Sequence, residues 1–233
     1  MSNYLYLILN LGSISIPLLY SVLEKKIHFI KYAKIVFISI FLVAVPFIIW
    51  DAVFTKHGVW GFNENYHLPF KIFKMPIEEW MFFFCIPYAC LFTHEMLKYY
   101  LPSLKLSKPV TIIISSILII VTFWLLIFNL DKSYTTVNFL LFLTIMLYSL
   151  KKHLITLQEY FLSFLVILIP FFIVNGILTG SFIDNPVVWY NNSENINVRL
   201  FTIPLEDVFY AFNLLFSIQL IFNFFKTKIY GNQ

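Results

Sequence analysis

Two copies of a Pro-x-Glu-acid motif supply the acidic groups in this sequence whose type and spacing suit acid–base chemistry. The first copy is Pro76-Ile-Glu-Glu79 and the second is Pro204-Leu-Glu-Asp207. Proline suits the first turn of a helix, and acids there are favoured by the positive end of the helix dipole, so either copy alone could be a helix start. Both copies, however, open strongly apolar segments, where ionisable groups are costly and usually functional.

The chemistry of these acids depends on two opposing influences. A helix N-terminus favours the carboxylate and apolar surroundings favour the neutral acid, so one motif can donate a proton while the other accepts one. Adjacent helical residues point about 100° apart, so we expect one acid of each pair to face a shared cavity. Because the first acid is Glu in both copies, we predict that Glu78 and Glu206 face the cavity and that Glu79 and Asp207 assist them.

Polar and aromatic residues around the first motif recur, more loosely, around the second. The residues that we expect to line a substrate site are Asp51, Trp60, Phe62, Asn63, Tyr66, Trp189 and Tyr190. In the second copy, Asn175 stands where the first has Asp51. Some of these rings fit an interfacial belt, but aromatic faces also attract cations. Acids among aromatic rings suit a reaction that protonates an alkene and shelters the resulting carbocation.

The elements that must position these residues are membrane helices. Hydrophobic residues make up 60% of the chain, charged residues 12%, and the mean hydropathy is +0.83, far from the balance of a soluble domain. Apolar runs predict an all-α polytopic membrane protein, a single membrane domain over residues 1–233. The predicted spans are 3–23, 33–51, 77–98, 110–129, 134–150, 159–179 and 204–225. The fifth is the weakest, because its strongly apolar part is short for a crossing.

Counting crossings places the two motifs relative to each other. Four predicted spans separate equivalent points, an even number, so both copies face the same side of the membrane in a parallel internal repeat. The halves cover approximately residues 1–100 and 134–225, joined by a linking helix at 110–129. Eleven of the 16 Lys and Arg residues fall on the other side, which predicts an outside N-terminus and a cytoplasmic C-terminus in a bacterial-type cell membrane. These cations form no basic stripe, so nucleic-acid binding is not expected.

With these residues, the chain resembles the membrane-integral lycopene cyclases. The resemblance rests on Asp51 and Thr55, on the string from Trp60 to Tyr66, and on the twin Pro-x-Glu-acid motif. That family occurs as two small subunits or as their fusion, and the chain is similar to the fused form. The resemblance implies that the linear ψ-end of lycopene is protonated, that the cation closes a six-membered ring, and that proton loss sets a β, ε or γ ring, with β expected.

For the site, the resemblance implies that Glu78, Glu206, Glu79 and Asp207 supply the general acid and the general base of a redox-neutral isomerisation. Lycopene and the lipid bilayer are the expected partners. Assembly with a second copy or with other carotenoid enzymes stays open. No flavin is expected, because the six glycines never form the Gly-x-Gly-x-x-Gly pattern of a flavin-binding fold. No other cofactor and no metal are expected either, since the two cysteines form no Cys-x-x-Cys pair.

Two other classes of membrane protein share some of these sequence features. A membrane prenyltransferase would carry Asp-rich clusters for magnesium and diphosphate, and the sequence has none. A proton-coupled transporter could use buried acids as relays, and composition alone does not separate it from an enzyme.

Overall fold

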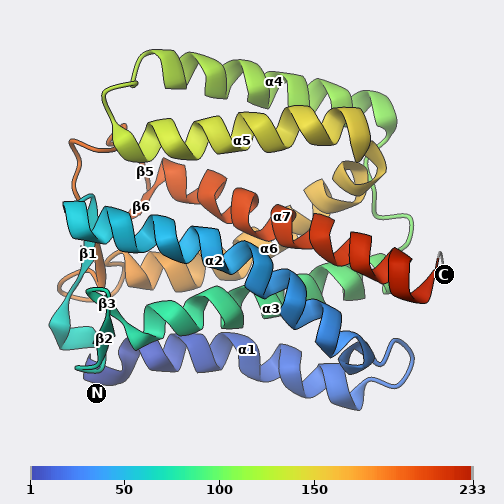
Figure 1. Cartoon of the computed structure of the whole chain (residues 1–233), viewed down its shortest axis with the longest axis horizontal. Helices are drawn as coiled ribbons and strands as arrows, with labels where there is room; N and C mark the ends of the chain where they lie inside the picture. The colour runs from blue at the N-terminus through green and yellow to red at the C-terminus, as the bar shows by residue number, and fades with distance from the viewer. Residues whose placement is uncertain (1, 232–233) are drawn as a thin grey trace.

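Seven long helices form the bundle in the computed structural model, which describes residues 2–231 (Figure 1). They are α1 (Leu5–Leu23), α2 (Ala33–His57), α3 (Ile77–Tyr100), α4 (Lys108–Ile127), α5 (Ser133–Lys152), α6 (Leu154–Leu178) and α7 (Leu205–Tyr230). All seven are long and apolar enough to cross a bilayer. The predicted all-α polytopic membrane architecture is therefore confirmed, including the fifth helix, which has 20 residues.

Helix α2 ends later than expected, and this changes the setting of one acid. The apolar pattern predicted an end at residue 51, but the helix continues to His57 and stops at Gly58, whose φ of 73° suits a glycine C-cap. Asp51 therefore lies inside the helix, where Thr55 donates a hydrogen bond to its carboxyl at 3.2 Å one turn later. The predicted span ended at the charged Asp51, but backbone hydrogen bonds continue the helix beyond this residue.

The helices pack in a repeated pattern. Helix α3 lies against α1 and α2, and α7 lies against α5 and α2. Helices α3 and α7 contact each other at the centre, α3 also packs on α6, and α4 covers α5 and α6 from outside (Figure 1). The contacts of α1 with α3 and of α2 with α7 thus have counterparts in those of α5 with α7 and of α6 with α3.

Short strands close one end of the bundle, where the sequence indicated only loops. They are β1 (Trp60–Phe62) paired with β4 (Val188–Tyr190), β2 (Lys71–Ile72) with β3 (Met75–Pro76), and β5 (Arg199–Leu200) with β6 (Ile203–Pro204), all antiparallel. The first pair joins the two long loops and sets Gly61 opposite Trp189. A Cβ at position 61 would collide with the Trp189 ring, so glycine is required for this close approach.

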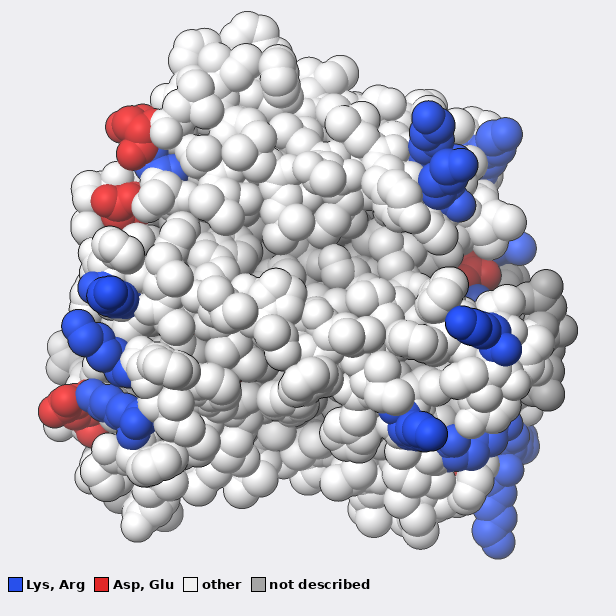
Figure 2. All heavy atoms as spheres, viewed as in Figure 1, with Lys and Arg blue, Asp and Glu red and all other residues white. Residues whose placement is uncertain are grey.

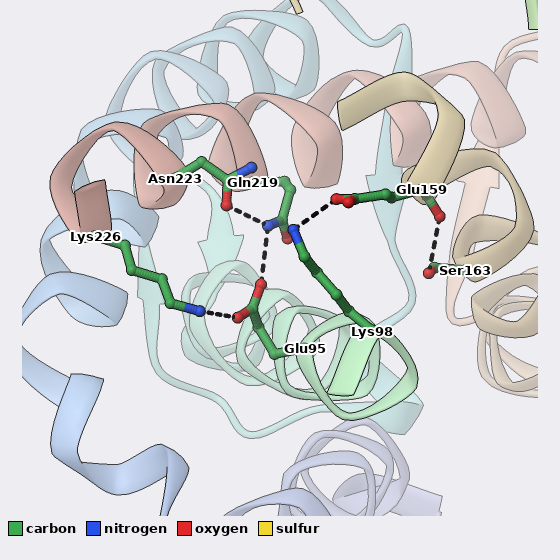
Figure 3. Close-up of polar contacts among 7 residues, drawn as sticks. All are labelled: Glu95, Lys98, Glu159, Ser163, Gln219, Asn223 and Lys226. Carbon is green, nitrogen blue, oxygen red and sulfur yellow. Dashed lines mark hydrogen bonds and ion pairs between the residues drawn. The ribbon is translucent and has the colours of Figure 1, made fainter. Parts of the chain in front are cut away.

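Charged side chains gather at the two ends of the bundle, with a broad uncharged band between them on the face drawn in Figure 2. At the end away from the strands, Lys226 pairs with the buried Glu95 at 2.5 Å, and Lys98 pairs with Glu159 at 2.6 Å (Figure 3). Gln219 also donates to Glu95, at 3.2 Å. These contacts tie α3, α6 and α7 together far from the twin acidic motifs.

Candidate active site

The first acid of each motif does not line the central cavity and instead binds the loop before its helix. Glu78 and Glu206 are fully buried, and each accepts a hydrogen bond at 2.8 Å from a backbone N–H ten residues earlier, at Leu68 and Ile196. Thr135 donates a second bond to Glu206 at 2.6 Å. The first acids thus hold the loops in place.

The second acids, Glu79 and Asp207, line the central cavity. The prediction that Glu78 and Glu206 face the cavity is therefore wrong. The physical reason is that neighbouring helical residues diverge by about 100°, and the loop N–H groups take the first acid of each pair. Equal residue type in the two copies indicated a shared role, but that role is loop binding.

The cavity has a volume of about 250 Å³ and combines carboxyl groups with aromatic rings. The carboxyl groups belong to Asp51, Glu79 and Asp207. The aromatic lining consists of Tyr6, Trp60, Phe62, Phe82, Tyr134, Phe171, Tyr190 and Tyr210. Among the described residues, none that lines it is Lys, Arg or His. The acids therefore face one another and the rings without a basic partner.

In the first half, two carboxyl groups lie close to each other on the cavity wall. They belong to Asp51 and Glu79, and below they are called the carboxyl pair. Tyr6 donates to Glu79 Oε2 at 2.5 Å, and Trp60 Nε1 donates to Asp51 Oδ1 at 2.5 Å. Two neighbouring buried carboxyl groups favour retention of one proton between them, because a second negative charge beside the first is costly. The carboxyl pair is therefore a candidate proton donor.

In the second half, one carboxyl group receives three neutral donors. Tyr134 donates to Asp207 Oδ1 at 2.7 Å, while Asn175 and Tyr190 each donate to Oδ2 at 2.9 Å. Three donors match the lone pairs of an ionised carboxylate. Burial, followed by the charge of Asp207, raises the pKa of Tyr190 well above its usual value, so this phenol remains a donor.

Aromatic rings surround the space between the two sets of acids. The ring of Trp60 lies 5.1 Å from that of Tyr134 and 6.1 Å from that of Tyr190, between centroids. Tyr210 lies 5.0 Å from Trp50, and Trp50 lies 5.7 Å from Phe54. The rings of Trp60, Tyr134, Tyr190 and Tyr210 line the cavity, and a ring face can attract a positive charge that develops there.

Four of the seven predicted lining residues reach the cavity: Asp51, Trp60, Phe62 and Tyr190. The other three do not, contrary to expectation. Asn63 caps a short 3-10 helix by accepting from Asn65 N at 3.1 Å, and Trp189 is 43% exposed above Gly61. Tyr66 packs in an apolar cluster beside the cavity. Strand alternation explains part of this, because successive residues point to opposite faces.

Three residues that donate hydrogen bonds to the second acids were not predicted as their partners from the sequence: Tyr6, Tyr134 and Asn175. The two tyrosines lie at the same distance, 73 residues, before the acid that each contacts. Asn10 and Asn138 likewise donate to the backbone carbonyls of Glu78 and Glu206 from 68 residues earlier, at 2.8 and 2.6 Å. Extending the repeat from the motifs into the first and fifth helices would have found these residues.

The geometry offers donors to carboxylates rather than a metal site. Over residues 2–231, no group of three or more His, Cys, Asp or Glu residues is arranged to hold a metal ion.

The fold and cavity define a polytopic membrane protein with a buried carboxyl site. A sequence model described as lycopene cyclase matches residues 3–97 and 131–225, more than half of the chain, so the chain belongs to the lycopene cyclase family, as the resemblance predicted. No curated protein and no solved structure matches the chain. Membership gives the chain the general function of a carotenoid cyclase, an enzyme working in a membrane.

Proposed function

We propose that the chain closes the linear ψ-end of lycopene, or of a related acyclic carotenoid, to a β ring in a redox-neutral isomerisation. The carboxyl pair is the proton donor and Asp207 is the acceptor. The observation that carries this assignment is that Glu79 and Asp207 line the same cavity with different partners. Glu79 lies beside a second carboxyl group, whereas Asp207 accepts hydrogen bonds from three neutral donors.

The proposed reaction balances without an oxidant or reductant. The proton of the carboxyl pair adds to the terminal double bond and leaves a tertiary cation. The next double bond attacks this cation, so a carbon–carbon bond forms and the six-membered ring closes. Asp207 then takes a neighbouring proton and restores a double bond. The proton that Asp207 gains returns to the carboxyl pair before the next turnover.

The surroundings of the acids support a carbocation in this position. The carboxylate of Asp207 supplies a fixed negative charge, and Trp60, Tyr134, Tyr190 and Tyr210 supply ring faces on the cavity wall. No lining residue in the described part of the chain is basic, so the cation meets no opposing charge.

The proposal includes a parallel repeat of residues 1–100 and 134–225, with 110–129 as the linking helix. Three observations support it: the family model matches twice, the contacts of Glu78 recur at Glu206, and β1 pairs antiparallel with β4. In that pairing, Gly61 lies opposite Trp189. These two residues are equivalent in the repeat, because each lies at the same distance before the proline of its own motif. Antiparallel pairing of equivalent strands is what a two-fold axis produces.

Orientation follows the charges. We place the end of the bundle that bears the strands outside, with the N-terminus, and the lysine-rich end in the cytoplasm, with the C-terminus. The lysines of residues 25–34 and 226–228 support this direction by the positive-inside rule. The acids then lie near the non-cytoplasmic face.

Expression in cells that accumulate lycopene tests the proposal, with the carotenoids resolved by chromatography. The chain is expected to convert lycopene to cyclic products. Glu79→Gln and Asp207→Asn remove an ionisable group at nearly constant size and are each expected to slow conversion by about 10²- to 10⁴-fold, the usual contribution of acid–base catalysis.

Glu64→Gln is the matched control, because Glu64 is exposed and pairs only with Lys71 outside the cavity. It should leave conversion unchanged at equal protein level. Unaltered lycopene with the unsubstituted chain would favour a transporter, and normal cyclisation by both site variants would reject the acid–base assignment. Dependence of the purified protein on added flavin would contradict the expectation that no cofactor is needed.

A further inference from the structure

The cavity beside the acids continues as a groove between α1 and α6, with α3 as its floor. Its walls include Ser13 and Pro17 of α1, Ala89 and Cys90 of α3, and Val174 of α6. From Glu79 to Thr93, the lining follows about 14 residues of α3, or roughly 21 Å at about 1.5 Å per residue. We call this channel the α1–α6 groove.

The wall of the α1–α6 groove suits a hydrocarbon. Its hydroxyl groups are already bonded to their own helices: Ser13 Oγ donates to Leu9 O at 2.7 Å, and Thr93 Oγ1 donates to Ala89 O at 2.8 Å. The remaining groove surface is apolar. Ser13, Pro17 and Val174 are partly exposed within apolar spans, so the groove opens sideways, toward lipid.

The equivalent space in the second half, between α5 and α2 over α7, is filled by larger side chains. Counted from the acidic motif of each half, Leu141 is the counterpart of Ser13, and Ile218 is the counterpart of Cys90. Ile218 is 1% exposed. These larger side chains pack in one apolar cluster with side chains of α2.

The α2 side of that space is filled most completely. Trp50 directly precedes Asp51, as Val174 directly precedes Asn175, so a tryptophan stands in place of a valine. Its ring lies 5.6 Å from that of Phe47 and 5.7 Å from that of Phe54, between centroids. These contacts place packed aromatic rings where the wall of the α1–α6 groove has Val174.

We propose that each chain has one polyene-binding groove and therefore cyclises one end of lycopene at a time. One half of the polyene lies in the α1–α6 groove with its ψ-end at the carboxyl pair and Asp207, and the other half extends toward lipid. A product with two rings then requires release and re-entry of the molecule in the opposite direction. This inference rests on the proposed function and deepens it, because the acids alone would allow two sites per chain.

Bound pigment, rather than activity, gives the direct test. The Glu79→Gln protein, inactive but able to bind, is purified from lycopene-accumulating cells, and the ratio of lycopene to protein is measured by absorbance. We expect a ratio near one. Adding Ala89→Phe should block the groove and lower bound lycopene at least tenfold. Adding Ser217→Phe, at the equivalent position of the second half, should change it less than twofold.

A second variant guards against misfolding of the first. Cys90→Ile copies the residue that fills the second half at Ile218, and it should also lower bound lycopene while the thermal unfolding temperature in detergent stays near that of the parent. A ratio near two, or loss of pigment with Ser217→Phe but not with Ala89→Phe or Cys90→Ile, would overturn the single-groove proposal.

The order of products separates this inference from the proposed function. In a time course with the unsubstituted chain, a one-ring carotenoid should appear free in the membrane before the two-ring product. Direct formation of the two-ring product would reject release between the two closures. If lycopene is not cyclised at all, the proposed function fails first. If it is cyclised equally well by the Ala89→Phe and Cys90→Ile forms, only the groove proposal fails.

Discussion

The two halves of the molecule share their scaffold and differ beside the second acid. Tyr6 and Tyr134 donate to Glu79 and Asp207 from equal distances along the chain. The position beside them is a carboxyl group in the first half, Asp51, and an amide in the second, Asn175. In the first half, two carboxyl groups lie close to each other, whereas in the second an amide N–H donates to the carboxyl group of Asp207. One change of functional group thus gives the second acids of the two halves different neighbours.

The halves also differ in the space that leads to their acids. The α1–α6 groove is open, and Val174 of its wall stands at the position that Trp50 occupies in the other half. Both differences favour the same division: substrate enters along the α1–α6 groove and meets the acids of both halves at one place. Duplication followed by divergence of a few buried residues is enough to turn two equal sites into one asymmetric site.

The largest effect is expected from making the first half like the second. Asp51→Asn keeps the size of the side chain but removes one carboxyl group of the carboxyl pair. If the carboxyl pair is the proton donor, ring closure should slow by about 10²- to 10⁴-fold. Cyclic carotenoid formed per unit of protein is the measurement. Wild-type conversion by this variant would show that Glu79 alone suffices and would remove Asp51 from the mechanism.

The reverse substitution should have the next largest effect. Asn175→Asp sets a second carboxyl group beside Asp207, and like charges so close favour retention of a proton between them. The acceptor would then be occupied, so we expect about 10²-fold slower conversion, within the range for loss of a general base.

A shift of the pH profile distinguishes this cause from a packing defect. Because the acceptor pair must lose its extra proton, activity of Asn175→Asp should recover as pH rises, relative to the unsubstituted chain. Asn175→Ala removes the amide without adding an acid and serves as the control: its activity should fall without that recovery. Equal pH profiles for the two variants would contradict the assignment of Asp207 as the base.

Sequence reasoning identified the helices, the twin motifs and the family, because long apolar runs and a repeated Pro-x-Glu-acid string are local signals. It failed on the direction of adjacent side chains. Glu78 and Glu79 stand next to each other, and only the position of Leu68 N, ten residues earlier in a folded loop, decides which acid faces the cavity. The pairing of β1 with β4, which turns Trp189 outward, is likewise a contact between distant segments that no local pattern encodes.

The smallest effect is expected from the first acids, and it tests that correction directly. In Glu78→Gln, the amide oxygen can still accept from Leu68 N, so the loop before α3 should keep its position. The same holds for Glu206→Gln and Ile196 N. We expect each variant to lose less than about tenfold in conversion, far below the loss on Glu79→Gln. A fall as large as that of Glu79→Gln, with an unchanged unfolding temperature, would return the catalytic role to the first acids. A fall accompanied by a lower unfolding temperature would instead fit loosened loops around an intact carboxyl pair.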